Sequence, residues 1–148
     1  MKRIFFLLAL ITICSCNKDK LYSKRLMKPG TWQVTELSVD GIEDQKTPYW
    51  EIDDCDIYEA SCTGRWVHPN IEYANFVWQF TNKGSSFTLN RINGADSCNF
   101  ITDSVEIQCY NYSGKYEVVE HKRNAMVFKS LETTGYPNNE VILKIEKP

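Results

Sequence analysis

The sequence predicts an all-β protein: an antiparallel up-and-down β-barrel in which seven or eight consecutive strands pair as a meander. Two observations lead to this fold class. Apolar and polar residues alternate through much of the chain after residue 28, and turn-forming residues interrupt the alternation roughly every eight to twelve residues. Such short strands form a sandwich or a barrel. Consecutive hairpins favour the barrel, whose last strand pairs with the first and leaves no free edge.

The opening strand, within 28–41, begins after a Pro-Gly pair and ends at an Asp-Gly turn. Trp32 and Val34 face one side of this strand, but the next apolar residues, Leu37 and Val39, have the opposite parity. One extra residue near position 35 or 36 would put all four on one face. We therefore predict a β-bulge there, which bends the strand as a barrel requires.

Later segments supply the other strands. Phe76, Trp78 and Phe80 alternate with polar or smaller residues, and a turn at 82–84 joins them to a strand at 86–92. Further strands are predicted at 104–110, 111–120, 125–131 and 141–146, with a bulge or tight turn at 113–114. Before the barrel, residues 21–28 suit a short helical turn under its floor.

Residues 42–73 show no sustained alternation. They combine two cysteines with an acidic cluster and several large aromatic rings, among them Trp50, Tyr58 and Trp66. Some thirty irregular residues are unusual in a compact domain. We interpret this stretch as an elaborated loop that contains a short hairpin closed by a disulfide.

The N-terminus predicts export and anchoring. Residues 1–15 form a signal peptide, because the apolar run at 4–13 is about half of the ~20 residues that a membrane-spanning helix needs. The segment 13–16, Ile-Cys-Ser-Cys, resembles a bacterial lipobox, which implies diacylglycerol and fatty acids such as palmitate on Cys16. Residues 16–27 would then hold the lipidated Cys, a polar tether and the helical turn, and 28–148 the barrel. The alternative is an ordinary cleaved signal peptide with a Cys at the junction.

Four cysteines remain in the mature chain once Cys16 is acylated. An even number in an exported protein favours two disulfides. The local pairs, Cys55 with Cys62 and Cys98 with Cys109, need the least rearrangement, and the two crossed pairings are the alternatives. Their spacing is too wide for a four-thiolate zinc site, so no metal is expected.

Charge and motifs exclude several classes of function. The mature chain has 15 basic and 19 acidic residues, without a basic block, which argues against nucleic acid as a partner. No hydrolase, metalloprotease, phosphate-binding or dinucleotide motif is present. We expect His68 and His121 to be solvated, and the acidic residues near position 55 to form a solvated loop. The sequence thus predicts no enzyme, no catalytic residue and no cofactor.

Several segments together resemble the lipocalin-like lipoproteins of Bacteroidetes: the Gly30-Thr31-Trp32 start, the Phe-x-Trp-x-Phe run that ends at Phe80, the segment 112–118 and the closing strand. The resemblance implies a lipocalin-like barrel in which Trp32 caps the floor against a basic side chain of the last strand, where Lys144 is available. It also implies attachment to the bacterial outer membrane. The charged pair at 18–19 is similar to surface-export signals of these lipoproteins, so the periplasmic and cell-surface sides both stay open.

The resemblance further implies a small apolar or amphiphilic ligand held in the barrel mouth. The candidate ligand-binding residues are aromatic side chains of the loop and of the strands: Trp50, Tyr58, Trp66, Phe87, Tyr116 and Phe128. An eight-stranded barrel is just wide enough to be filled by side chains or to hold one small ligand. The alternative is an interaction module that contacts an envelope protein or a glycan through residues 42–73.

Overall fold

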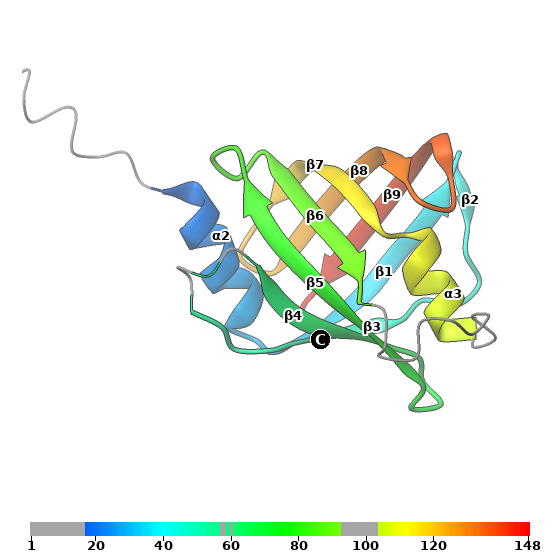
Figure 1. The fold of residues 1–148 in the computed structure, drawn as a ribbon, viewed down its shortest axis with the longest axis horizontal. Coiled ribbons are helices and arrows are strands. Elements are labelled where there is room, and N and C mark those ends of the chain that lie inside the picture. Colours follow the sequence, from blue (N-terminus) through cyan, green and yellow to red (C-terminus); the bar gives the residue numbers. More distant parts are fainter. Residues whose placement is uncertain (1–16, 57–58, 60, 93–103) are drawn as a thin grey trace, which may run out of the picture.

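The computed structural model describes residues 17–56, 59, 61–92 and 104–148. They form an antiparallel β-barrel of eight strands with one short extra strand and two helices (Figure 1). The helices are α2 (Lys18–Met27) and α3 (Ser104–Asn111). The strands are β1 (Thr31–Val39), β2 (Ile42–Glu43), β3 (Tyr49–Ile52), β4 (Cys62–Val67), β5 (Tyr73–Thr81), β6 (Ser86–Arg91), β7 (Gly114–His121), β8 (Ala125–Thr133) and β9 (Pro137–Glu146).

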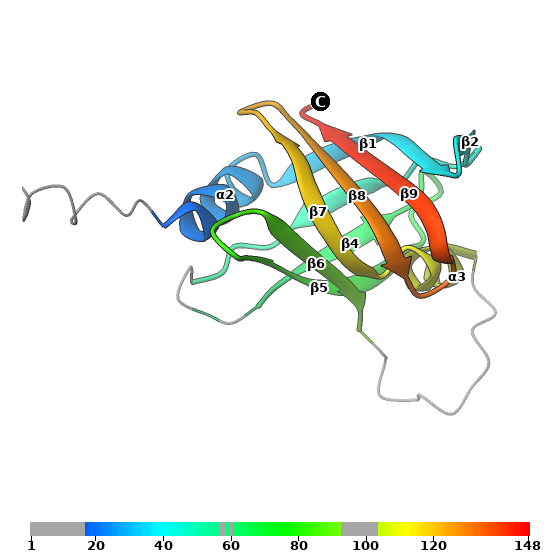
Figure 2. The same ribbon diagram turned by 90° about the horizontal axis from the view of Figure 1, so that it is seen from above.

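Strand pairing confirms the meander. From β3 onwards each strand pairs with its sequence neighbour, and β1 pairs with both β3 and β9, so the sheet closes on itself (Figure 2). The short strand β2 adds to the end of β1. Closure satisfies the backbone hydrogen bonds that an open sheet would leave at its edges.

The predicted bulge in β1 is present. The pairing of β1 with β9 shifts register between Val34 and Glu36, and the intervening Thr35 is exposed. On either side of it Trp32, Val34 and Leu37 are each at most 1% exposed. The extra residue thus brings side chains of opposite sequence parity into one core.

Aromatic rings fill the barrel interior. The Trp50 ring lies 5.5 Å from that of Phe76, 5.9 Å from that of Trp66 and 6.2 Å from that of Phe87, measured between centroids. The Phe87 and Phe128 rings stack at 4.5 Å. All five side chains are fully buried. Their mutual contacts make the interior a packed core.

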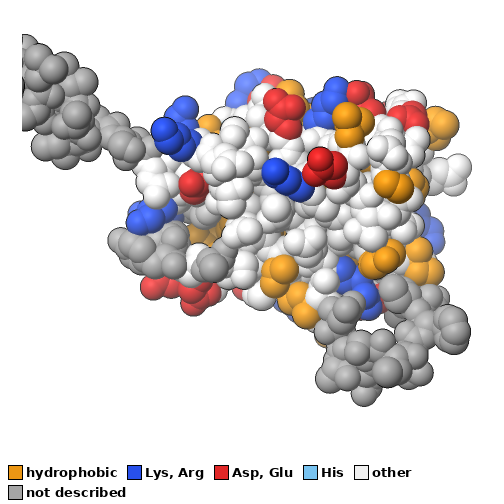
Figure 3. Space-filling model, turned by 45° about the horizontal axis from the view of Figure 1, so that its top comes forward, with side chains coloured by type: hydrophobic (Ala, Val, Ile, Leu, Met, Phe, Trp, Pro, Cys, Tyr) orange, Lys and Arg blue, Asp and Glu red, His pale blue; other side chains and the backbone are white. Residues whose placement is uncertain are grey.

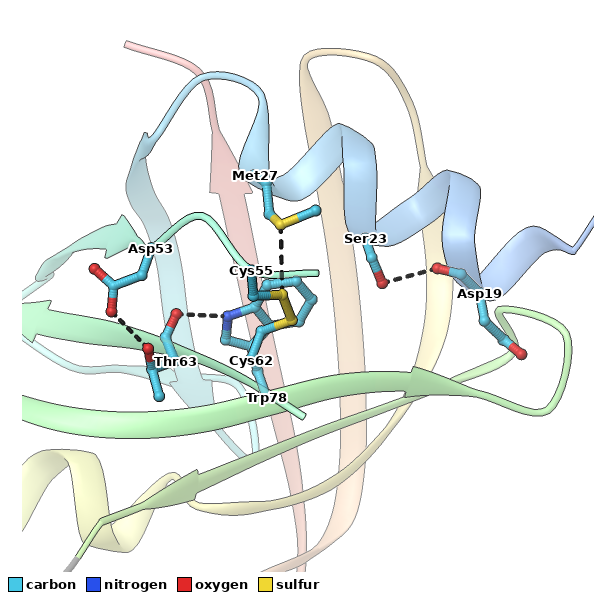
Figure 4. The surroundings of a disulfide bond; sticks show 8 residues. All are labelled: Asp19, Ser23, Met27, Asp53, Cys55, Cys62, Thr63 and Trp78. Carbon is cyan, nitrogen blue, oxygen red and sulfur yellow. Dashed lines mark hydrogen bonds between the residues drawn. A yellow bond between two sulfur atoms is a disulfide. The ribbon is translucent and has the colours of Figure 1, made fainter. Parts of the chain in front are cut away.

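The stretch 42–73 is more regular than we predicted, because it contains three strands. The expected hairpin is β3 with β4, and the Cys55–Cys62 disulfide closes it (Figure 4). Strands β3 and β4 pair Trp50 opposite Trp66, both facing inward. The two tryptophans therefore belong to the core and not to the surface of a loop.

One predicted strand is wrong: residues 104–110 form the helix α3. Val105, Ile107 and Cys109 alternate as in a strand, but Val105, Gln108, Cys109 and Tyr112 also recur at helical spacing, and these four are the buried ones. Because Gln108 is polar, counting apolar residues alone does not reveal the helical spacing. As a result β7 begins at Gly114, three residues after the predicted start.

The two helices lie at opposite ends of the barrel, and α2 closes the end away from α3 (Figures 1 and 2). Leu26 is fully buried, and its carbonyl oxygen accepts a hydrogen bond from Trp32 Nε1 at 2.7 Å. The Tyr22 ring stacks on His121 with 3.4 Å between centroids. The helix is longer than the predicted turn, because Asn17 caps it, and residues 18–20, predicted as a tether, are its first turn.

A basic residue does lie over Trp32, but it is Lys147. The Lys147 ammonium is 5.8 Å from the Trp32 ring centroid, within cation–π range. Lys144, which the family resemblance suggested, pairs with Glu146 at 2.7 Å instead. Alternation along β9 explains the difference: Ile145 points into the core, so its neighbour Lys144 points outward.

We expect the fold to lose stability as the pH falls from about 6.5 towards 4, because of His121. Burial, followed by the charge of Arg25, lowers the pKa of His121 from 6.5 to about 4. Between these values the unfolded chain binds the extra proton and the folded chain does not, so stability falls as the pH drops from 6.5 towards 4. Urea unfolding across this range measures the effect. A His121→Gln variant should lose this part of the pH dependence, and an unchanged profile would contradict the assignment.

Candidate functional site at the α3 end

The helix α3 lies across the end of the barrel opposite α2 (Figure 2). Val105 and Cys109 are fully buried against the barrel interior. An ion pair between Arg91 and Glu106 ties the helix to the end of β6. These contacts hold the buried face of α3 over the aromatic core.

Gln108 is the centre of a buried hydrogen-bond network. Its side-chain oxygen accepts from Trp66 Nε1 at 2.9 Å and lies 2.8 Å from His68 Nε2. Its amide nitrogen donates to Asp44 Oδ2 at 3.0 Å and to the Lys46 carbonyl oxygen at 2.8 Å. Both acceptor sites and both donors of the amide are used. One side chain thus joins α3 to the end of β4 and to the loop after β2.

This network fixes the tautomer of the neutral His68 ring. An indole N–H can only donate, so the Gln108 atom that faces Trp66 is the oxygen, and the His68 nitrogen that faces the same oxygen carries a hydrogen. In the neutral ring Nδ1 then holds the lone pair and is the acceptor. We expected His68 to be solvated, which is wrong, because it is only 4% exposed.

Two tyrosines extend the network towards the surface. The Tyr112 hydroxyl lies 3.4 Å from Asp44 Oδ2, and the Tyr112 and Tyr136 rings are 5.3 Å apart. Burial, with the nearby Asp44 carboxylate and the Tyr136 hydroxyl, raises the pKa of Tyr112. Gly135 lets the β8–β9 turn approach α3, since a Cβ there would lie 2.5 Å from the Asn111 side chain. Tyr136 is thereby held against Tyr112.

Two adjoining pockets open beside this network. One, of about 300 Å³, lies between the β1–β2 turn and the tyrosines, and the other, of about 260 Å³, lies over His68 and Gln108. Asp44 and Tyr136 line both. We call this region the α3 mouth, defined by Asp44, Lys46, His68, Gln108, Tyr112 and Tyr136.

A larger depression, of about 390 Å³, lies on the barrel wall over β6 to β8. Its lining includes Lys115, Glu117, Lys129 and Glu132, so charges of both signs alternate there. One of its buried hydroxyls, on Ser130, already donates to the Lys115 carbonyl oxygen at 2.6 Å. The α3 mouth is the better candidate, because it combines aromatic rings with a buried polar network.

Most of the predicted ligand-binding residues lie below the α3 mouth, in the core. Trp50, Trp66, Phe87, Tyr116 and Phe128 are each at most 1% exposed, and their rings contact other rings of the set or of the core. Tyr58 lies outside the described residues. A ligand among these rings would have to displace their contacts. Their predicted role in binding stays a prediction.

The disulfide between Cys55 and Cys62 is confirmed. Cys109 is buried in α3 and has no disulfide partner among the described residues, and burial, followed by the charge of Glu106, raises the pKa of its thiol. Its predicted partner Cys98 and the lipidation residue Cys16 lie outside the described residues. The second disulfide and the acylation therefore stay predictions.

Sequence reasoning missed five residues of the α3 mouth: Asp44, Lys46, Gln108, Tyr112 and Tyr136. Their spacing carries no motif, because they come from a loop, a helix and two connections that only the closed barrel brings together. In the part of the chain that the structure describes, no three His, Cys, Asp or Glu side chains are grouped to hold a metal, and no helix is long and apolar enough to cross a membrane.

Comparison with known proteins adds little to this geometry. No protein-family profile matches the chain, and no curated protein matches it. Among solved structures the chain is similar to an uncharacterized protein from Bacteroides eggerthii, with 12% sequence identity and a TM-score of 0.46. The match covers 78% of this chain and 96% of the other.

Proposed function

We propose that this protein is a lipocalin-like lipoprotein, anchored to the bacterial outer membrane through Cys16, that binds a small amphiphilic ligand at the α3 mouth. One observation carries the proposal. The aromatic core fills the barrel, and two pockets of about 300 and 260 Å³ adjoin at its end around a buried network of polar groups. The barrel then acts as a rigid scaffold, and its mouth is the binding surface.

The lining of the α3 mouth indicates an amphiphilic ligand. The rings of Tyr112 and Tyr136 offer apolar surface, and the exposed side chains of Ile42 and Ile107 border the two pockets. His68 Nδ1 is an acceptor for a hydroxyl or N–H group of the ligand. A molecule with an apolar part and a hydrogen-bonding head matches both features.

The position of Cys16 supports a membrane-anchored role. Cys16 immediately precedes Asn17, the cap of α2, and α2 and α3 lie at opposite ends of the barrel (Figure 1). A lipid on Cys16 would hold the α2 end at the membrane. The α3 mouth would then face away from the lipid and be open to ligands in solution.

Titration with dansyl-undecanoic acid, a fluorescent single-chain amphiphile, tests the binding site. We expect binding with a rise in fluorescence, about tenfold weaker in a Tyr136→Ala variant because both pockets lose a shared wall. A Val119→Ala variant is the matched control, since Val119 is an exposed apolar residue of β7 outside these pockets. Unchanged binding in Tyr136→Ala would place the site elsewhere, and no binding of the amphiphile would contradict the ligand class.

Native mass spectrometry of detergent-extracted protein tests the anchor. The mature chain should begin at Cys16 and carry the added mass of a diacylglycerol and an N-acyl chain. A Cys16→Ser variant should lose that mass and leave the membrane fraction. An unmodified mature N-terminus in the wild-type protein would refute the anchoring.

A further inference from the structure

The positive charge of the mature chain is concentrated around α2. Residues 17–28 contain five basic side chains and one carboxylate, a net charge of +4, whereas residues 29–148 contain 10 basic and 18 acidic residues, a net charge of −8. The carboxylate is Asp19, which accepts a hydrogen bond from the Gly84 N–H at 2.5 Å. The segment next to Cys16 thus carries a net positive charge, whereas the rest of the protein carries a net negative charge.

Helix geometry gives α2 an outer face of basic residues. Tyr22 and Leu26 are four residues apart and turn towards the barrel. At about 100° per residue, Leu21, Lys24 and Lys28 lie on the opposite side of the helix. Lys24 and Lys28 are exposed and Leu21 is half-buried. We call these three residues the outer face of α2.

Contacts on the inner side fix this orientation. Asp19 bonds the β5–β6 turn, Tyr22 stacks on His121, and the Leu26 carbonyl oxygen accepts from Trp32. A single residue, the cap Asn17, stands between Cys16 and the first residue of the helix, so no long tether separates the helix from that position. A lipid on Cys16 would bring the helix itself to the membrane surface.

The described part of the acidic β3–β4 connection contacts α2 on a flank, at Met27. Cys55 Sγ lies 3.6 Å from Met27 Sδ, and the Asp53 carboxylate accepts from the Thr63 hydroxyl on β4 at 2.7 Å (Figure 4). In Figure 3 basic side chains lie at the α2 end, with one acidic side chain between them and further acidic ones below. The outer face therefore keeps its positive charge.

We propose that the outer face of α2 lies against anionic lipid headgroups of the leaflet that holds Cys16. Charge complementarity identifies this partner, because exposed lysines beside a membrane anchor are attracted to an anionic leaflet, whereas the acidic remainder of the protein is repelled by it. The barrel then sits directly on the membrane with the α3 mouth pointing away. The inference rests on the proposed anchoring and adds a defined orientation to it.

Lysine footprinting of the purified full-length protein on vesicles tests this orientation. An amine-acetylating reagent is applied to the protein on vesicles of phosphatidylcholine alone or with phosphatidylglycerol, and each lysine is read by mass spectrometry. On the anionic vesicles Lys24 and Lys28 should react at least about fivefold more slowly. High salt should restore their reaction. Lys46 and Lys115 are exposed near the α3 end and serve as internal controls that should not change.

A pair of charge-reversal variants completes the test. In Lys24→Glu the anionic vesicles should no longer protect Lys28, whereas Lys115→Glu/Lys129→Glu on the barrel wall should keep that protection. Equal labelling on both vesicle types, or equal protection by soluble polyphosphate, would overturn the proposal. The mass spectra also report Cys16: an unmodified Cys16 refutes the anchor, while the footprint on added vesicles still decides the role of α2.

Discussion

Replacing Trp50 with alanine is expected to lower the free energy of unfolding by about 3 to 5 kcal/mol. Trp50 is fully buried at the centre of the barrel and contacts the rings of Trp66, Phe76, Phe87 and Phe128. Its removal takes away apolar contacts and leaves a cavity that the rigid wall of strands cannot close. Guanidinium chloride unfolding of both proteins measures the difference.

A Trp50→Phe variant is the matched control. Within the described residues the Trp50 indole N–H has no hydrogen-bond partner, so phenylalanine keeps a ring and removes an unsatisfied donor. We expect Trp50→Phe to lower the free energy of unfolding far less than Trp50→Ala does. A loss below about 1 kcal/mol for Trp50→Ala would contradict a tightly packed interior.

The alanine variant also tests whether the barrel can be turned into a carrier. A dry apolar cavity in a packed core binds small molecules such as benzene. We therefore expect benzene to raise the thermal midpoint of Trp50→Ala and to leave that of the wild-type protein unchanged. Stabilisation of the wild-type protein by benzene would instead favour a pocket inside the native barrel.

The second large effect is expected at Gln108. A Gln108→Leu variant keeps a buried side chain of similar size but removes the acceptor of Trp66 Nε1 and His68 Nε2 and a donor to Asp44. Buried polar groups left without partners are costly, and we expect a loss of about 2 to 4 kcal/mol in the free energy of unfolding. The α3 mouth should also loosen, with weaker binding of the dansyl amphiphile.

A Tyr110→Leu variant controls for the change in helix composition, because Tyr110 is 43% exposed on the same helix. Its free energy of unfolding should lie within about 0.5 kcal/mol of that of the wild-type protein. Urea titrations compare the three proteins. A Gln108→Leu variant as stable as this control would show that the network contributes little.

The fold class could be predicted from the sequence because most of the barrel strands show a local alternation of apolar and polar residues. The parity change after Val34 predicts the bulge, and the alternation through Phe76, Trp78 and Phe80 predicts a strand with one buried face. The even spacing of hairpins predicts closure. These features depend only on neighbouring residues, whose side chains alternate between the two faces of a strand.

Two errors have a common cause. The segment 104–110 satisfies both periodicities, and only burial of Gln108 and Tyr112 distinguishes helix from strand. Lys144 and Lys147 were both near the end of the chain, and the inward direction of Ile145 decided which one meets Trp32. In both cases long-range packing selected between alternatives that local sequence leaves nearly equal.

By itself, the sequence determined a closed antiparallel barrel with a bulged first strand and a local disulfide, because strand periodicity, turns and cysteine spacing act over short separations. Only the tertiary structure decided that aromatic rings fill the barrel and that Asp44, His68, Gln108 and Tyr112 meet at one end of it. The physical reason is that packing volume and hydrogen bonding are properties of the assembled barrel. Residues far away along the chain decide whether a ring packs into the core or lines a ligand pocket, and whether a buried polar group finds a hydrogen-bond partner.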